Sequence, residues 1–156
     1  MTSQLSVDAF LDQPAIAVVG ASRLGKKFGN IACRELRAKG YRVHIVHPSG
    51  APVDGERSYS SLSELPERVG AVLIVVPPAA ALQVVREAAE AGIRHVWLQQ
   101  GAESPAVLDA CRELGLDVVS GECILMFARP TGVHKVHYWI NRVTRSLPIA
   151  ESPLAH

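Results

Sequence analysis

An apolar run that stops at a glycine and continues into a short basic turn most restricts the fold of this chain. Residues 15–19 read Ala-Ile-Ala-Val-Val, and the segment Gly20 to Gly29 then carries three basic residues before a helical pattern begins. A buried strand that leads through such a turn into a helix presents backbone N–H groups and the positive end of the helix dipole together. We therefore predict that residues 20–29 bind a phosphate.

The turn has the spacing of a Walker loop but lacks its metal-binding residue. Gly20 and Lys26 match G-x-x-x-x-G-K, yet Lys27 stands where a Ser or Thr hydroxyl would hold magnesium. The later apolar run at residues 71–76 also ends in two prolines, with no Asp to complete a metal site. The sequence thus disfavours NTP hydrolysis.

The dinucleotide fingerprint G-x-G-x-x-G is absent too. Ser22 occupies the position of the second glycine, which would let the backbone approach a pyrophosphate. A dinucleotide site also needs an acidic residue after the second strand for the ribose 2′-hydroxyl. No carboxylate occurs between Glu35 and Asp54, so NAD recognition loses its usual anchor.

Length and composition indicate one compact domain over residues 1–156. The chain is 48% apolar and 20% charged, which is typical of a globular protein with a sizeable core. No apolar run approaches the roughly 18 residues that span a bilayer, and residues 1–13 do not resemble a secretory signal. We expect a cytoplasmic protein without membrane contact. A helical extension is predicted at about residues 127–147.

The three cysteines and the uneven charge narrow the ligand classes. The cysteines are odd in number and form no C-x-x-C pair, so neither a disulfide framework nor a metal site is expected. Seven Lys or Arg residues against one Glu between positions 23 and 42 suit a polyanionic small ligand or a nucleic acid. Because aromatics are only 5% of the chain and none interleaves with these charges, nucleic acid is disfavoured.

Strand and helix patterns alternate along the chain. Continuous apolar runs are typical of a parallel sheet covered on both faces. We predict a doubly wound α/β domain, a Rossmann-like three-layer sandwich with a mainly parallel sheet of five or six strands and a ligand above the strands' carboxyl ends. The predicted strands are residues 15–20, 42–47, 71–76, 95–98 and 117–120, and the clearest helices are residues 79–92 and 104–115.

A series of short motifs over residues 10–126 resembles the small stand-alone bacterial CoA-binding proteins. The motifs are Gly20-Ala-Ser-Arg, Lys27-Phe-Gly29, Gly40-Tyr41, His47-Pro48, Gly55, Tyr59-Ser-Ser-Leu62, Val76-Pro-Pro78, Trp97-Leu-Gln-Gln-Gly101 and Glu122-Cys-Ile124. That family is similar to the CoA-binding domain of the succinyl-CoA synthetase alpha subunit and of NDP-forming acyl-CoA synthetases. This chain departs from the pattern at Gly25, Lys26 and Gly121-Glu122, which makes the first turn more flexible and more basic.

The resemblance implies coenzyme A, or an acyl-CoA, as the ligand. It places the phosphates at the first turn, the adenosine at the ends of the second and third predicted strands, and the pantetheine arm or its thiol at the end of the fourth. The residues are Gly20, Ala21, Ser22, Arg23, Lys27 and Gly29 for the phosphates, His47, Pro48, Val76, Pro77 and Pro78 for the adenosine, and Gln99 and Gly101 for the arm.

The favoured hypothesis is a non-catalytic carrier, sensor or partner module. Catalysis in the larger synthetases needs a separate domain whose histidine carries phosphate, and a chain of 156 residues has no room for that domain. One alternative is a nicotinamide-dinucleotide sensor or oxidoreductase on the same fold. Another is a cysteine enzyme acting on acyl thioesters, with Cys123 as nucleophile and a histidine of the C-terminal segment as base. Cys123 follows a predicted strand and does not begin a helix, whose N-terminus would lower the pKa of the thiol. Its position therefore disfavours the cysteine-enzyme hypothesis. A homo-oligomer or a protein partner stays open.

Overall fold

A computed structural model describes residues 2–25 and 27–127 of the chain. The predicted extension at about residues 127–147 falls almost entirely outside the described residues. The elements in chain order are α1 (Gln4–Leu11), β1 (Ala15–Val19), α2 (Phe28–Ala38), β2 (Arg42–Val46), β3 (Ser58–Tyr59), η1 (Leu62–Glu64), β4 (Ala71–Ile74), α3 (Pro78–Glu90), β5 (His95–Leu98), α4 (Pro105–Glu113), β6 (Asp117–Ser120) and η2 (Ile124–Met126), where η denotes a 3₁₀ helix.

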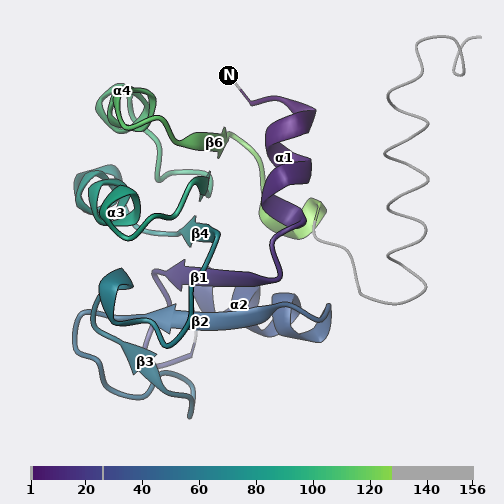
Figure 1. The fold of residues 1–156 in the computed structure, drawn as a ribbon. Coiled ribbons are helices and arrows are strands. Elements are labelled where there is room, and N and C mark those ends of the chain that lie inside the picture. Colours follow the sequence, from purple (N-terminus) through teal and green to yellow (C-terminus); the bar gives the residue numbers. More distant parts are fainter. Residues whose placement is uncertain (1, 26, 128–156) are drawn as a thin grey trace, which may run out of the picture.

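All strands of the sheet run parallel, in the order β3-β2-β1-β4-β5-β6 (Figure 1). This is the strand order of Rossmann domains, and the chain reverses its direction of winding between β1 and β4. The prediction of a parallel, doubly wound sheet of five or six strands is confirmed with six. Carboxyl ends of parallel strands lie at one edge, so the loops that follow the strands gather there.

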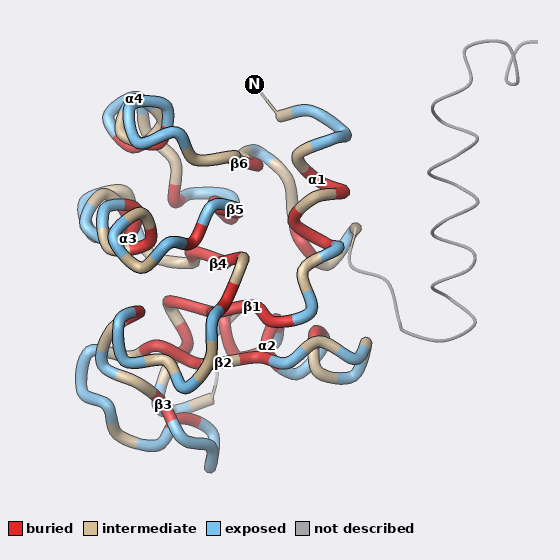
Figure 2. The backbone as a smooth tube through the Cα atoms, in the orientation of Figure 1, coloured by how far each residue is buried: buried red, intermediate tan, exposed pale blue. Residues whose placement is uncertain are grey.

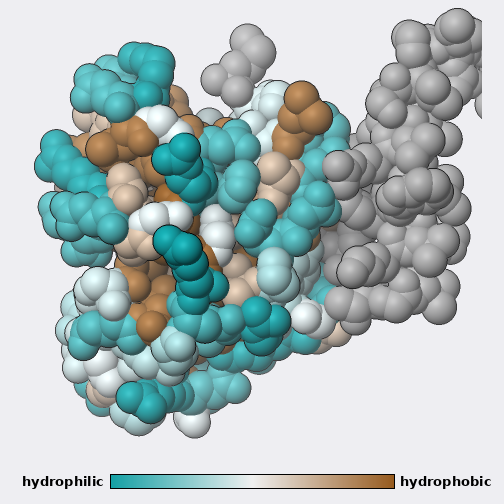
Figure 3. All heavy atoms as spheres, viewed as in Figure 1, coloured by the Kyte–Doolittle hydropathy of each residue, from teal (hydrophilic) through white to brown (hydrophobic). Residues whose placement is uncertain are grey.

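Successive residues of β1 point to opposite faces of the sheet, and each face is covered by helices. Ile16 and Val18 belong to the apolar cluster formed with α1 and α2, whereas Ala17 and Val19 belong to the one formed with α3 and α4. Figure 2 shows the buried residues concentrated in the central strands and on the inner sides of the helices. In the space-filling view, side chains over α3 and α4 are mainly hydrophilic, and apolar ones gather in the recess beside them (Figure 3).

Local signals set the helix ends. Ser104 accepts a hydrogen bond from the Val107 amide (3.2 Å), and Pro105 occupies the first turn of α4. Helix α3 likewise begins with Pro78 and ends just before Gly92. Helix α1 and strand β3 were not predicted. Helix α1 packs Phe10 against Trp97, with ring centroids 5.3 Å apart, and β3 adds the sixth strand at the edge.

None of the helices in the described part of the chain has the length and hydropathy that a membrane crossing requires.

Candidate functional site

The loops that follow β1, β2, β4 and β5 meet at one edge of the sheet. They contain, in turn, residues 20–27, His47, residues 75–77 and residues 99–102. In a doubly wound sheet the point where the winding reverses leaves a crevice above the strand ends, here between β1 and β4. The candidate site is therefore centred on the turn after β1.

Two glycines allow this turn to pack tightly. Gly20 has φ +125°, and a Cβ atom there would lie 2.3 Å from the carbonyl oxygen of Val75, which follows β4. A Cβ atom at Gly29 would lie 2.7 Å from the carbonyl oxygen of Gly20. Side chains at either position would force the backbone apart. The two glycines thus bring the N-terminus of α2, the positive end of its dipole, against the end of β1 at the crevice.

Asn30 holds the turn in shape, a role that the sequence analysis missed. Its side chain is 1% exposed, and its Oδ1 accepts hydrogen bonds from the amides of Ser22 (2.8 Å) and Lys27 (3.3 Å). Its Nδ2 donates to the Ser22 carbonyl at 2.8 Å. One buried carboxamide therefore ties both ends of the turn to the first turn of α2. No local pattern signals this role, because Ser22 and Asn30 are eight residues apart.

The hydrogen bonds of Ser22 are mostly used within the turn. Its amide donates to Asn30, and its hydroxyl oxygen accepts from the amide of Leu24 at 3.1 Å. Arg23 and Lys27 are exposed, and within the described residues neither forms an ion pair. Their positive charges are thus free for an anion at the turn. Ala21 is buried.

His47 and Pro48 follow β2 at the same edge. The Nδ1 atom of His47 accepts a hydrogen bond from the Ser49 amide at 3.2 Å and is also hydrogen-bonded to the Ser49 hydroxyl at 2.8 Å. In the neutral form the ring proton therefore lies on Nε2. Pro48 is exposed, whereas His47 is half-buried.

A cavity of about 230 Å³ lies between the ends of β4 and β5. The structure thus brings Val76 and Pro77 together with Gln99 and Gly101, whereas Pro78 begins α3 beside the cavity. Gln99 is 6% exposed and Gln100 is exposed, as expected for neighbours at a strand end. The residues around the cavity are Val75, Val76, Pro77, Gln99, Gln100, Gly101 and Ala102.

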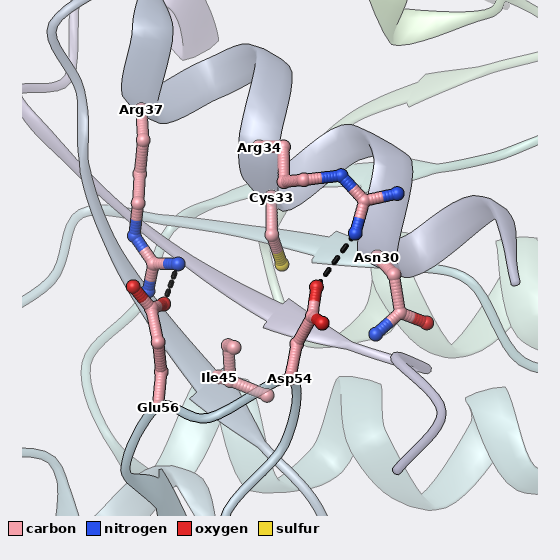
Figure 4. Close-up of a pocket in the computed structure, with 7 residues that line it drawn as sticks. All are labelled: Asn30, Cys33, Arg34, Arg37, Ile45, Asp54 and Glu56. Atoms are coloured by element: carbon pink, nitrogen blue, oxygen red, sulfur yellow. Dashed lines mark hydrogen bonds and ion pairs between the residues drawn. The ribbon is translucent and has the colours of Figure 1, made fainter. Parts of the chain in front are cut away.

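A second cavity, of about 440 Å³, lies between α2 and the loop that joins β2 to β3 (Figure 4). Neighbouring parallel strands are usually joined through a helix. Residues 47–57, which join β2 to β3, form no helix and leave a hollow beside α2. Arg34 pairs with Asp54 at 2.6 Å, and Arg37 pairs with Glu56, so that ion pairs bridge the hollow. Cys33 lies on its α2 side.

Two groups at this cavity bear on the alternative functions. The Cys33 thiol concerns thioester catalysis, and the Asp54 carboxylate concerns dinucleotide binding. Burial raises the pKa of Cys33 to about 11, so this cysteine is a poor nucleophile at neutral pH. Asp54 lies against the turn after β1, since a Cβ atom at Gly25 would lie 3.0 Å from its Oδ1. The tertiary structure thus supplies a carboxylate near the turn that the second strand's own sequence lacks, although Arg34 pairs with it.

Within the described residues, no three His, Cys, Asp or Glu side chains are grouped in a way that could hold a metal ion. Cys123 is half-buried and precedes η2. The histidines considered as its partners lie at positions 134, 137 and 156, outside the described residues.

The strand order, with a glycine-bounded turn between β1 and α2 at the crevice, defines a Rossmann-like α/β domain. The chain belongs to the CoA-binding domain family, whose model matches residues 14–129. The predicted family resemblance is thereby confirmed, including the relationship to the CoA-binding part of ADP-forming acetate–CoA ligases.

Known proteins similar to this chain fall into two groups. The alpha subunit of ADP-forming acetate–CoA ligase II from Pyrococcus furiosus is 27% identical over 129 residues, which are 76% of this chain but only 28% of that subunit. The chain thus spans about a quarter of this curated relative.

Solved structures of small proteins match over most of their length. A conserved hypothetical protein from Pyrococcus furiosus is 40% identical, with a TM-score of 0.67, and the match covers 72% of this chain and 97% of that one. A protein from Thermus thermophilus is 31% identical, with a TM-score of 0.71 and coverage of 80% and 96%. The domain therefore occurs both as a small protein and as part of larger ligase subunits.

Proposed function

We propose that this chain binds coenzyme A or an acyl-CoA and acts as a carrier, sensor or partner module without catalysing a reaction itself. The observation that carries the proposal is the turn at residues 20–29, which Gly20 and Gly29 press against the sheet and which Asn30 fixes in shape. Membership of the CoA-binding domain family supports the same ligand.

In this proposal the pyrophosphate of CoA lies over the turn. The N-terminus of α2 and the unpaired charges of Arg23 and Lys27 favour two phosphates there. The adenosine lies toward His47 and Pro48, on the β2 side of the crevice. The pantetheine arm lies on the opposite side, toward β4 and β5. Val76, Pro77 and Pro78 follow β4 and border both halves.

The chemistry of the cysteines supports binding rather than thioester catalysis. Burial raises the pKa of both Cys33 and Cys111 to about 11, which leaves little thiolate at neutral pH. Cys123 precedes a three-residue 3₁₀ helix, which is too short to act as an activating helix N-terminus. A thioester hydrolase activity that disappears in Cys123→Ala would contradict this proposal.

A nicotinamide dinucleotide is the competing ligand, because Asp54 lies beside the turn. Its carboxylate would have to leave Arg34 to accept bonds from a ribose. Thermal unfolding with each ligand separates the alternatives, since a ligand that binds only the native state raises the melting temperature. We expect CoA to raise it more than NAD, FAD or ATP, with no effect of magnesium, and native mass spectrometry to detect a CoA-sized ligand. Equal shifts with NAD and CoA would refute the preference.

The role of the turn is tested with Lys27→Ala. We expect CoA binding to weaken by about 1–3 kcal/mol, the scale of a charge-assisted hydrogen bond, and the loss to shrink at high salt. Lys39→Ala, at the other end of α2, is the matched control. Pantetheine, which has no pyrophosphate, should bind weakly and be indifferent to Lys27→Ala. Equal losses for both ligands would mean that Lys27 does not act on the phosphates.

A further inference from the structure

The cavity of about 440 Å³ lies beside β2, on the α2 side of the sheet, and not in the crevice between β1 and β4. Its volume falls within the usual range for small-molecule sites. Arg34 and Arg37 of α2 line one side, and Asp54 and Glu56 of the facing loop line the other (Figure 4). These two positive and two negative charges sum to zero. Such a lining is complementary to a ligand that carries both signs of charge itself.

A tight hairpin holds the two carboxylates in place. Val53 and Glu56 form an antiparallel bridge, in which the Val53 amide donates to the Glu56 carbonyl at 2.8 Å and the Glu56 amide donates back at 2.9 Å. Between them, Asp54 and Gly55 have φ values of 54° and 77°, the pattern of a two-residue type I′ turn. The Val53 side chain is fully buried and anchors the hairpin. The acidic side of the cavity is therefore preformed.

The ion pair between Arg34 and Asp54 leaves bonding capacity on both partners. Arg34 donates one of its five N–H groups to Oδ2 of Asp54, and Oδ1 of Asp54 has no hydrogen bond within the described residues. Arg37, in contrast, is bonded both to Glu56 and to the Val43 carbonyl. The side chains of Arg34 and Asp54 are 54% and 40% exposed, so that a ligand can reach them. Arg34 can accommodate a carboxylate and Asp54 an ammonium group without separation of the pair.

The short distance within this pair restricts the ligand further. Nη1 of Arg34 and Oδ2 of Asp54 are 2.6 Å apart, so a ligand that bonds both residues must carry its own two charges close together. A carboxylate and an ammonium group on the same carbon atom meet this condition. The lining also includes the buried, apolar Ile45 and the buried thiol of Cys33, which favour a small apolar side chain.

We propose that this cavity binds a free α-amino acid with a small apolar side chain, its carboxylate on Arg34 and its ammonium group on Asp54. The inference goes beyond the proposed binding of CoA and does not depend on it. Asn30 lines this cavity and also ties the turn at residues 20–29 through its carboxamide. An amino acid in the cavity therefore contacts a residue that shapes the other site.

The experiment is an NMR titration of the isotope-labelled, full-length protein without CoA. The probe is L-valine, and two compounds of similar size serve as controls. δ-Aminovaleric acid is an isomer of valine with the same two charges at opposite ends of its chain. Isovalerate has the carbon skeleton and carboxylate of valine but no ammonium group. Amide signals of residues 30–37 and 53–56 report binding in the cavity.

Two conservative variants remove one ligand group each. Arg34→Gln removes the partner of the carboxylate. Asp54→Asn removes the partner of the ammonium group and keeps the hairpin, because Asn-Gly also favours a type I′ turn. Arg112→Gln and Asp109→Asn are the matched controls, since these residues form an exposed ion pair on α4. Thermal unfolding verifies that each variant folds, and Asp54→Asn carries the test if Arg34→Gln does not fold.

We expect valine to shift the signals of residues 30–37 and 53–56 in a saturable way at millimolar concentration, because the charges that it meets are partly exposed. δ-Aminovaleric acid and isovalerate should each bind about tenfold more weakly, the scale of one charge-assisted hydrogen bond at an accessible site. Arg34→Gln and Asp54→Asn should weaken valine to a similar extent, and the α4 variants should leave it unchanged.

Several results would overturn the assignment. No saturable shift at about 50 mM valine would mean that the cavity is not an amino-acid site. Equal binding of valine and δ-aminovaleric acid would mean that the short charge separation is not recognised. Unchanged valine binding in the folded Arg34 and Asp54 variants would place the ligand elsewhere. Failure of the wild-type protein to bind CoA would instead refute the proposed function and leave these measurements unaffected, so the two failures are distinguishable.

Discussion

Replacing Asn30 by alanine tests whether its side chain holds the turn at residues 20–29 in shape. The substitution removes all three hydrogen bonds that the side chain makes to the turn, two of them at 2.8 Å and one at 3.3 Å. At about 1 kcal/mol for each good bond and less for the long one, the free energy of unfolding should fall by about 2–3 kcal/mol. Water can reach the half-buried Ser22 in part, which keeps the loss near the lower value.

Asn30→Asp separates shape from charge. The carboxylate can still accept from the amides of Ser22 and Lys27, but it loses the donor to the Ser22 carbonyl and places a negative charge beneath the turn. We expect a loss of stability at least as large as with alanine, because the carboxylate is buried and one of its oxygens faces the Ser22 carbonyl. We expect a larger loss of CoA affinity, because the charge repels the phosphates. Ile31→Ala, an exposed neighbour on the same helix, is the control for helix propensity.

Denaturant unfolding measures the stability of each variant, and calorimetry with CoA measures the affinity. A change in the free energy of unfolding below about 0.5 kcal/mol for Asn30→Ala, the scale of an ordinary surface substitution, together with unchanged CoA binding, would refute the bracing role. A stability loss without any loss of affinity would mean that the shape of the turn does not matter to the ligand.

Two further predictions follow from the titrating groups. In the folded protein, a thiol reagent at neutral pH should modify the half-buried Cys123 and spare Cys33 and Cys111, because burial raises the pKa of these two thiols to about 11. Peptide mass spectrometry identifies the modified cysteines. Rapid modification of Cys33 would contradict its burial. Hydrogen bonds from Arg42 and then His44 lower the pKa of Glu67 to about 2, so its contribution to stability is present above pH 4.5 and is lost as the pH falls from 4.5 toward 2. The unfolding free energy of Glu67→Gln should accordingly depend less on pH in that window than that of wild type, and identical pH profiles would rule this out.

The alternation of strands and helices could be predicted from the sequence because it depends on local patterns. Apolar runs such as residues 71–74 specify buried parallel strands, and Ser104 with Pro105 specifies the start of α4. Gly20 marks the turn after β1 through its own φ of +125°, whereas its close approach to Val75 depends on tertiary packing. Helix α1 and the two-residue strand β3 were missed, because both depend on packing against partners far along the chain.

The sequence by itself determined the fold class and, through its motifs, the family, and it predicted a site at the strand ends. Only the tertiary structure decided how individual side chains act there. It placed the Asn30 side chain against both ends of the turn, set Asp54 beside Gly25, and bonded the side-chain oxygen of Gln99 to the amide of Ile124. These contacts join residues whose separation in sequence carries no periodic signal. Their geometry follows from the packing of strands and loops against one another, which no local pattern records.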